Sequence, residues 1–72
     1  MQRNWEDFAQ AIILKAIEDY RNALKPARYP SEEKKARAAI REIERFFRSE
    51  WFEVLTELDG ETLIRKLKEE RS

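Results

Sequence analysis

Five basic residues form a regular row in the middle of the sequence and could bind phosphate groups or an acidic partner. The row consists of Lys34, Arg37, Arg41, Arg45 and Arg48. In a helix, spacings of three and four positions place these side chains along one line, about 21 Å long. Such a line could follow a nucleic-acid backbone. The alternative is a solvated helix face, in which Glu33 and Glu44 form ion pairs with arginines three or four positions away.

The stretch FFRSEWF, residues 46–52, places four aromatic rings in seven positions. These rings could stack on bases or fill the corner between two helices. A base-stacking surface would alternate its rings with basic residues, whereas here Glu50 and Glu53 would repel phosphate. We therefore predict a packed corner in which Trp51 faces inward, with Phe52 at the edge of the buried face. On this prediction, Trp51→Ala costs about 3–5 kcal/mol.

Catalytic and metal-binding chemistry has little support in this composition. The chain contains no histidine and no cysteine, which removes the usual general base, the commonest metal ligand and any thiolate. A single glycine excludes a glycine-rich phosphate loop, and the DGE stretch at 59–61 is too sparse for a calcium loop. We expect no enzyme activity, no catalytic residue, no metal or cofactor site and no small-molecule substrate.

The bulk composition favours a small all-α protein. The 72 residues are 42% charged and 42% hydrophobic, with a formal net charge of zero. Such a chain fits one domain over residues 1–72, a compact bundle of three main helices and a short one. The longest apolar run, residues 11–14, is too short to cross a membrane, and the first residues do not resemble a signal peptide. We expect a cytoplasmic protein that does not bind membranes.

The apolar spacing predicts the first two helices. Residues 1–25 form one helix capped by Asn4, because Pro26 disfavours helical geometry in the residue before it. Ser31 caps a second helix. The predicted buried residues of the first helix are Trp5, Phe8, Ala9, Ile12, Ile13, Ala16, Ile17, Tyr20 and Leu24. Those of the second are Ala36, Ala39, Ile40, Ile43, Phe46 and Phe47.

The remaining residues predict a short helix and a final one. Ser49 caps a helix over 50–57, although residues 31–58 could also form one long helix. Asp59 caps the last helix. The inward-facing residues of these two helices are Trp51, Val54, Leu55, Leu58, Leu63, Ile64 and Leu67.

Two apolar residues have no place in these buried faces. Leu14 falls nearly opposite the stripe of the first helix, and Tyr29 lies in the PARYP connector. A chain this short buries only about 60% of its surface, so eight aromatic residues are more than it can easily cover. Leu14 and Tyr29 are therefore candidate contacts for a protein partner or a homodimer.

The stretch RFFRSEWFEVLTELDGETLIRKL, residues 45–67, resembles short uncharacterised proteins encoded in prophages and mobile elements of Gram-positive bacteria. The resemblance covers about a third of the chain and implies an accessory protein that acts by binding. The residues that carry it, among them Ser49, Asp59 and Trp51, are predicted caps and core residues, so they indicate fold maintenance. We expect a non-catalytic interaction protein; the alternative is a nucleic-acid-binding protein that uses the basic row.

Overall fold

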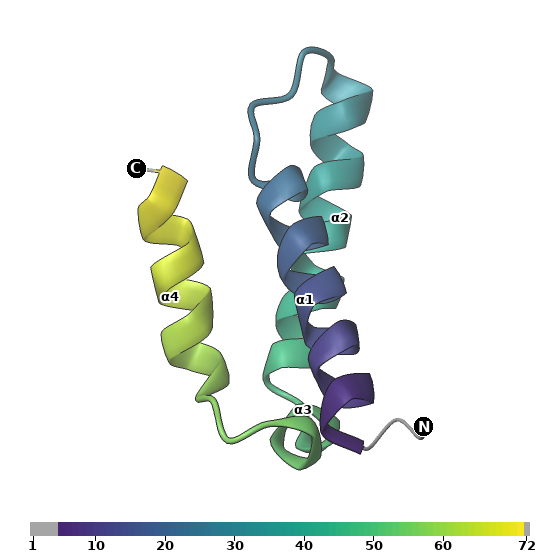
Figure 1. Ribbon diagram of the computed structural model, residues 1–72. Helices are drawn as coiled ribbons and strands as arrows, with labels where there is room; N and C mark the ends of the chain where they lie inside the picture. The colour runs from purple at the N-terminus through teal and green to yellow at the C-terminus, as the bar shows by residue number, and fades with distance from the viewer. Residues whose placement is uncertain (1–4, 72) are drawn as a thin grey trace.

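Four helices account for most of the chain in the computed structural model, which describes residues 5–71 apart from the side chain of Arg71 (Figure 1). They are α1 (Trp5–Ala23), α2 (Pro30–Phe47), α3 (Glu50–Leu55) and α4 (Gly60–Arg71). No strand occurs in this part of the chain. The predicted all-α bundle of three main helices and a short one is therefore confirmed. Asn4, the predicted cap of α1, lies outside the described residues.

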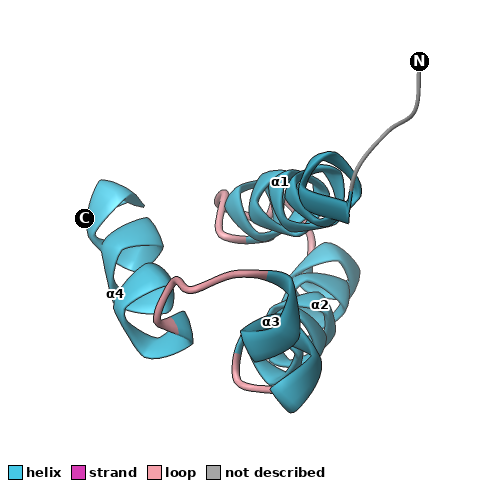
Figure 2. Ribbon diagram, turned by 60° about the horizontal axis from the view of Figure 1, so that its bottom comes forward, coloured by secondary structure: helices cyan, strands magenta, loops and turns pink. Residues whose placement is uncertain are grey.

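The helices form a bundle around α2. Helices α1 and α2 run side by side, while α3 lies across their lower ends and α4 stands to one side (Figures 1 and 2). Helix α4 packs mainly on α2 rather than on α1. The molecule is elongated, with principal extents of 46 × 25 × 20 Å. Its two ends are consequently far apart and can carry different surfaces.

Polar side chains cap α3 and α4 at the residues predicted from the sequence. The Ser49 hydroxyl accepts a hydrogen bond from the Phe52 N–H at 3.2 Å and donates one to the Phe46 carbonyl at 2.6 Å. Residues 31–58 therefore form two helices rather than one. Asp59 accepts hydrogen bonds from the Thr62 N–H at 3.1 Å and the Thr62 hydroxyl at 2.6 Å, which confirms it as the cap of α4.

Three predicted boundaries are wrong by a few residues. Helix α2 begins at Pro30 with Tyr29 as its N-cap and no side-chain cap, because a proline suits the first helical position and needs no N–H partner there. Ser31 is therefore inside the helix. Helix α1 ends at Ala23, before Pro26 requires it, and α3 ends at Leu55 instead of residue 57.

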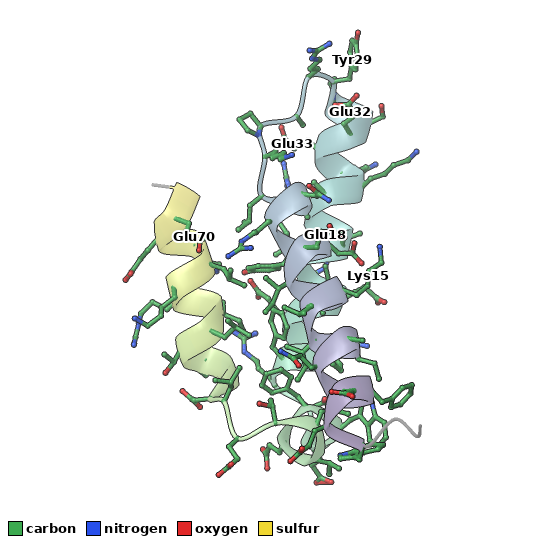
Figure 3. The ribbon with its side chains drawn as sticks, viewed as in Figure 1. Lys15, Glu18, Tyr29, Glu32, Glu33 and Glu70 are labelled. Carbon is green, nitrogen blue, oxygen red and sulfur yellow. The ribbon has the colours of Figure 1, made fainter. Side chains whose placement is uncertain are left out.

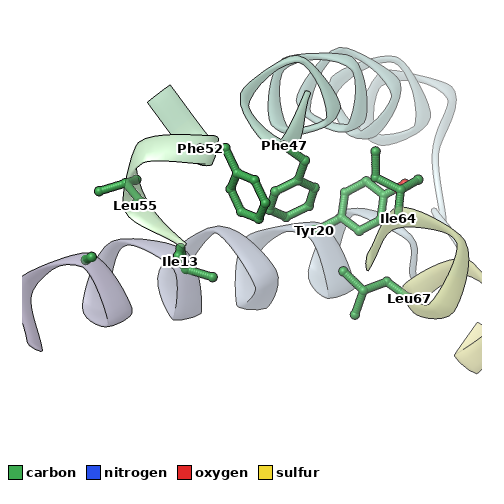
Figure 4. Packing of buried hydrophobic residues seen from close by; sticks show 8 residues of the cluster. Ile13, Tyr20, Phe47, Phe52, Leu55, Ile64 and Leu67 are labelled. Atoms are coloured by element: carbon green, nitrogen blue, oxygen red, sulfur yellow. The ribbon is translucent and has the colours of Figure 1, made fainter. Parts of the chain in front are cut away.

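The core is built largely from rings contributed by three helices. Tyr20 of α1 meets Phe47 of α2 with ring centroids 5.7 Å apart, and Phe47 meets Phe52 of α3 at 5.5 Å, both nearly edge-on (Figure 4). All three side chains are essentially inaccessible to water. The aliphatic part of the core consists of Ala9, Ile13, Leu55, Ile64 and Leu67. A packed aromatic corner at Ser49 is confirmed, with Phe52 as its central ring on α3.

The prediction for the orientation of α3 is wrong. Trp51 is 51% exposed and Phe52 is 1% exposed, the reverse of the expected order. Adjacent residues on a helix point about 100° apart, so a short helix covered on one side can bury only one of the two. Packing against Phe46 and Phe47 of α2 selects Phe52. Four other residues expected inside are also about half exposed or more: Trp5, Phe8, Val54 and Leu58.

Candidate partner-binding surface

The predicted basic row lies along the exposed side of α2, but its charges are partly neutralised. Arg37 forms an ion pair with Glu33, and Arg48 forms one with Glu61 of α4. Lys34, Arg41 and Arg45 form no ion pair with another described residue. The row therefore presents two arginines and one lysine that are not paired with a described residue. Three such cations would bind a nucleic-acid backbone only weakly.

Glu44 connects three helices. The sequence predicts only ion pairs between Glu44 and arginines on the exposed face of the helix. Its carboxylate accepts a hydrogen bond from the Tyr20 hydroxyl of α1 at 2.6 Å and lies 3.4 Å from the Lys68 ammonium of α4. The Arg48 guanidinium lies 3.5 Å away, and the Glu44 side chain is only 13% exposed. The expected pair with Arg48 is thus present and no pair with Arg41 forms. The cluster thereby connects α1, α2 and α4.

The sequence contains a signal for this cluster. Glu44 lies four positions after Ile40 and three before Phe47, which places it within the apolar stripe of α2 rather than on the opposite face. A carboxylate in such a position requires a buried donor. Tyr20, in the stripe of the neighbouring helix, supplies it.

Folding changes the pKa of both members of this pair. Burial would raise the pKa of the Glu44 carboxyl, but hydrogen bonds from Tyr20 and Lys68 outweigh burial and lower the pKa below its ordinary value. Burial and the nearby Glu44 carboxylate raise the pKa of the Tyr20 hydroxyl well above its usual range. Tyr20 therefore stays protonated and donates to an ionised Glu44 at neutral pH.

Acid should weaken this contribution to stability. A group whose pKa is lowered by folding stabilises the protein above its unfolded pKa, here about 4.5, and stops doing so as the pH falls through the folded value. We expect Glu44→Gln to lower the free energy of unfolding at neutral pH, and the deficit to shrink at about pH 3. Urea unfolding at both pH values measures this.

Glu42→Gln is the matched control, because Glu42 is an exposed carboxylate on the same helix. Its effect should stay within about 0.5 kcal/mol at both pH values. A deficit for Glu44→Gln that is unchanged in acid would show that the carboxylate charge does not stabilise the bundle.

Large apolar side chains are exposed at one end of the molecule, which we call the apolar end and define as residues 5–14 and 50–58. Trp5 of α1 packs edge-on against Trp51 of α3, with ring centroids 6.2 Å apart, and Phe8 lies 5.8 Å from Trp5. The exposed large hydrophobic side chains of this end are Trp5, Phe8, Leu14, Trp51, Val54 and Leu58, each 48–61% exposed. Tyr29, the remaining one among the described residues, is 61% exposed on the α1–α2 connection at the opposite end (Figure 3).

Leu14 lies in a groove at this end. Helix α1 forms one wall with Ile13, Leu14 and Ile17, and the segment after α3 forms the other with Leu55 and Leu58. The groove has a volume of about 450 Å³. Its lining is mostly aliphatic, so burying it against a partner would be favourable. The structure thus brings Leu14 together with Leu58, while Tyr29 lies far from both.

The apolar end is also the acidic end. Residues 5–14 contain two carboxylates and residues 50–58 contain three, and neither segment contains a lysine or arginine; Asp59 and Glu61 follow shortly after the second segment. Arg3, the nearest basic residue before the first segment, lies outside the described residues. Glu61 pairs with Arg48 and Asp59 caps α4. Four others form no ion pair with a described residue: Glu6, Glu50, Glu53 and Glu57.

Comparisons with known proteins add nothing to this description. No protein-family model, no curated protein and no solved structure matches the chain. The resemblance to prophage-encoded proteins therefore stays a prediction. Among the described residues, no helix is both long and apolar enough to cross a membrane, and no three potential metal ligands are grouped around a common point.

Proposed function

We propose that this protein is a non-catalytic interaction protein that binds a protein partner through its apolar end, in the setting of a phage or mobile element. The observation that carries the proposal is the Trp5–Trp51 pair. Two tryptophans from separate helices pack together at the surface, each about half exposed. Exposed aromatic clusters of this kind are typical of binding sites, where tryptophan supplies much of the binding energy.

The distribution of exposed side chains supports the same surface. Six large hydrophobic side chains gather on one end, whereas scattered single residues would need no explanation. The chain has a well-packed aromatic core, so these residues are not required to close it. Exposed apolar side chains lower solubility, and a partner that covers them would remove this disadvantage.

A capture experiment with two variants tests the proposal. The protein is immobilised and exposed to a lysate of a Gram-positive bacterium at about 0.1 M and 0.5 M NaCl, and the retained proteins are identified by mass spectrometry. We expect a partner retained at both salt concentrations, because apolar contacts persist in salt. Trp51→Ala should weaken retention about tenfold or more, since tryptophan anchors typically contribute 2 kcal/mol or more.

Tyr29→Ala is the matched control, because it removes an aromatic ring at the opposite end that is at least as exposed as Trp51, and the variant should retain the partner. Equal retention by Trp51→Ala and the parent, or no specific retention, would contradict the proposal. The protein could instead retain nucleic acid, and lose it at high salt and on Arg41→Ala and Arg45→Ala substitution. That result would indicate that the basic row is the functional surface.

A further inference from the structure

The charges around the apolar end restrict its partner further, on the assumption that the proposed function is right. Glu6 lies in the wall of the Leu14 groove, and Glu57 directly precedes Leu58 of the opposite wall. Glu50 and Glu53 flank Trp51 on α3. These four carboxylates have no described cationic partner, so the field around the apolar surface is negative.

This field argues against three classes of partner. Nucleic acid and anionic membranes would be repelled, because both present negative charge. A second copy of the chain, joined through the same end, would bring two sets of uncompensated carboxylates together, and such like-charge contacts are unfavourable. A cationic protein segment, in contrast, would pair with these groups around an apolar centre.

The shape of the groove indicates the conformation of that segment. Gln10, Ile13, Leu14 and Ile17 line it over two turns of α1, so a segment in the groove runs beside a helix. Helices pack against such a surface by inserting rows of side chains spaced three and four positions apart. Addition of a β-strand requires an exposed sheet edge, and the described residues contain no strand.

We infer that the apolar end binds a basic amphipathic helix. Its aliphatic stripe contacts Leu14, Ile17 and Leu58 in the groove, and its lysine or arginine side chains face Glu6 and Glu57. The Trp5–Trp51 pair does not line the groove and offers a second apolar contact at the same end. The helix would lie beside α1, in the groove between α1 and the segment after α3.

Three synthetic peptides test this inference. Each is about 18 residues long, or five helical turns, with the same leucine stripe, and their polar positions carry mainly lysine, glutamine or glutamate. Binding is measured by the anisotropy of a fluorescent label. At about 0.05 M NaCl, the lysine peptide should bind at least about tenfold more tightly than the glutamate peptide, with glutamine between them. The difference should narrow at about 0.5 M NaCl.

Two double variants locate the charge effect. Glu6→Lys/Glu57→Lys should remove or reverse the preference for the lysine peptide. Glu42→Lys/Glu69→Lys changes the net charge equally at exposed carboxylates outside the apolar end, and it should retain most of the preference. A preference lost equally in both double variants would show a response to net charge alone and would overturn the inference.

The glutamine peptide separates this inference from the proposed function. If it binds the parent but not Leu14→Glu, while the glutamate peptide binds as tightly as the lysine peptide, the apolar surface stands and the basic partner is wrong. If none of the three peptides binds, the helix inference fails, and the capture experiment with Trp51→Ala decides the proposed function separately. A dimer in sedimentation that Leu14→Glu dissociates would assign the surface to a second copy.

Discussion

Phe52→Ala should cost about 3–5 kcal/mol of the free energy of unfolding. The Phe52 ring is 1% exposed and contacts both Phe47 and Phe46, with ring centroids 5.5 and 5.6 Å away. Removing it leaves a cavity where α2 and α3 meet, and close packing prevents the surrounding rings from filling it fully. In a bundle this small, a loss of that size is a large part of the total stability.

Trp51→Ala provides the comparison within the same helix. Trp51 is the larger ring, but half of it is exposed and its aromatic contact is with Trp5, which is also half exposed. We expect a loss of about 1 kcal/mol, since such ring pairs contribute about 0.5–1.5 kcal/mol. Urea unfolding followed by circular dichroism measures both variants. A loss for Trp51→Ala equal to that for Phe52→Ala would contradict the observed rotation of α3.

These two residues show where sequence reasoning reached its limit. The order of the helices, the break at Ser49 and the cap at Asp59 follow from local chemistry, because a capping side chain bonds to the backbone a few residues away. The rotation of a six-residue helix depends instead on what covers it. The spacing of Trp51, Val54, Leu55 and Leu58 fits a helical stripe, and only the packing of α3 across α1 and α2 selects Phe52 and Leu55.

The same limit applies to the candidate surface. Leu14 was predicted to be exposed from its place on the helix alone, and it is exposed. Its neighbour Leu58 could not be predicted, because Leu58 follows the end of α3 and comes near α1 only through the path of the connection. The sequence predicts Trp5 and Trp51 in the core, since aromatic rings at helical spacing are usually buried. Both side chains are exposed, so they form the centre of the proposed binding surface instead of part of the core.

Helix α4 owes its position to close approach at its first residue. A Cβ atom added to Gly60 would lie 2.9 Å from the carbonyl carbon of Phe47 and closer still to the carbonyl oxygen. No real Cβ tolerates such a distance, and backbone atoms at the end of α2 cannot turn away as a flexible side chain could. Gly60 does not have a positive φ, so its requirement for glycine is one of space alone.

Gly60→Ala therefore has two effects of opposite sign on the free energy of unfolding. Alanine favours helices by up to about 1 kcal/mol relative to glycine, which would stabilise α4. The clash with Phe47 should cost more, because α4 must move away and loosen the burial of Ile64 and Leu67, which are each 3% exposed. We expect a net loss of about 2–3 kcal/mol, the size typical of an overpacked site.

Glu50→Ala is the control for this substitution, since Glu50 is the exposed first residue of α3 and its replacement creates no clash. Its effect on urea unfolding should stay within about 0.5 kcal/mol. If Gly60→Ala is as stable as the parent, helix propensity exceeds the steric cost, and α4 is not held against the end of α2. The ion pair between Arg48 and Glu61 would then also be lost or weakened, because it joins the end of α2 to the start of α4.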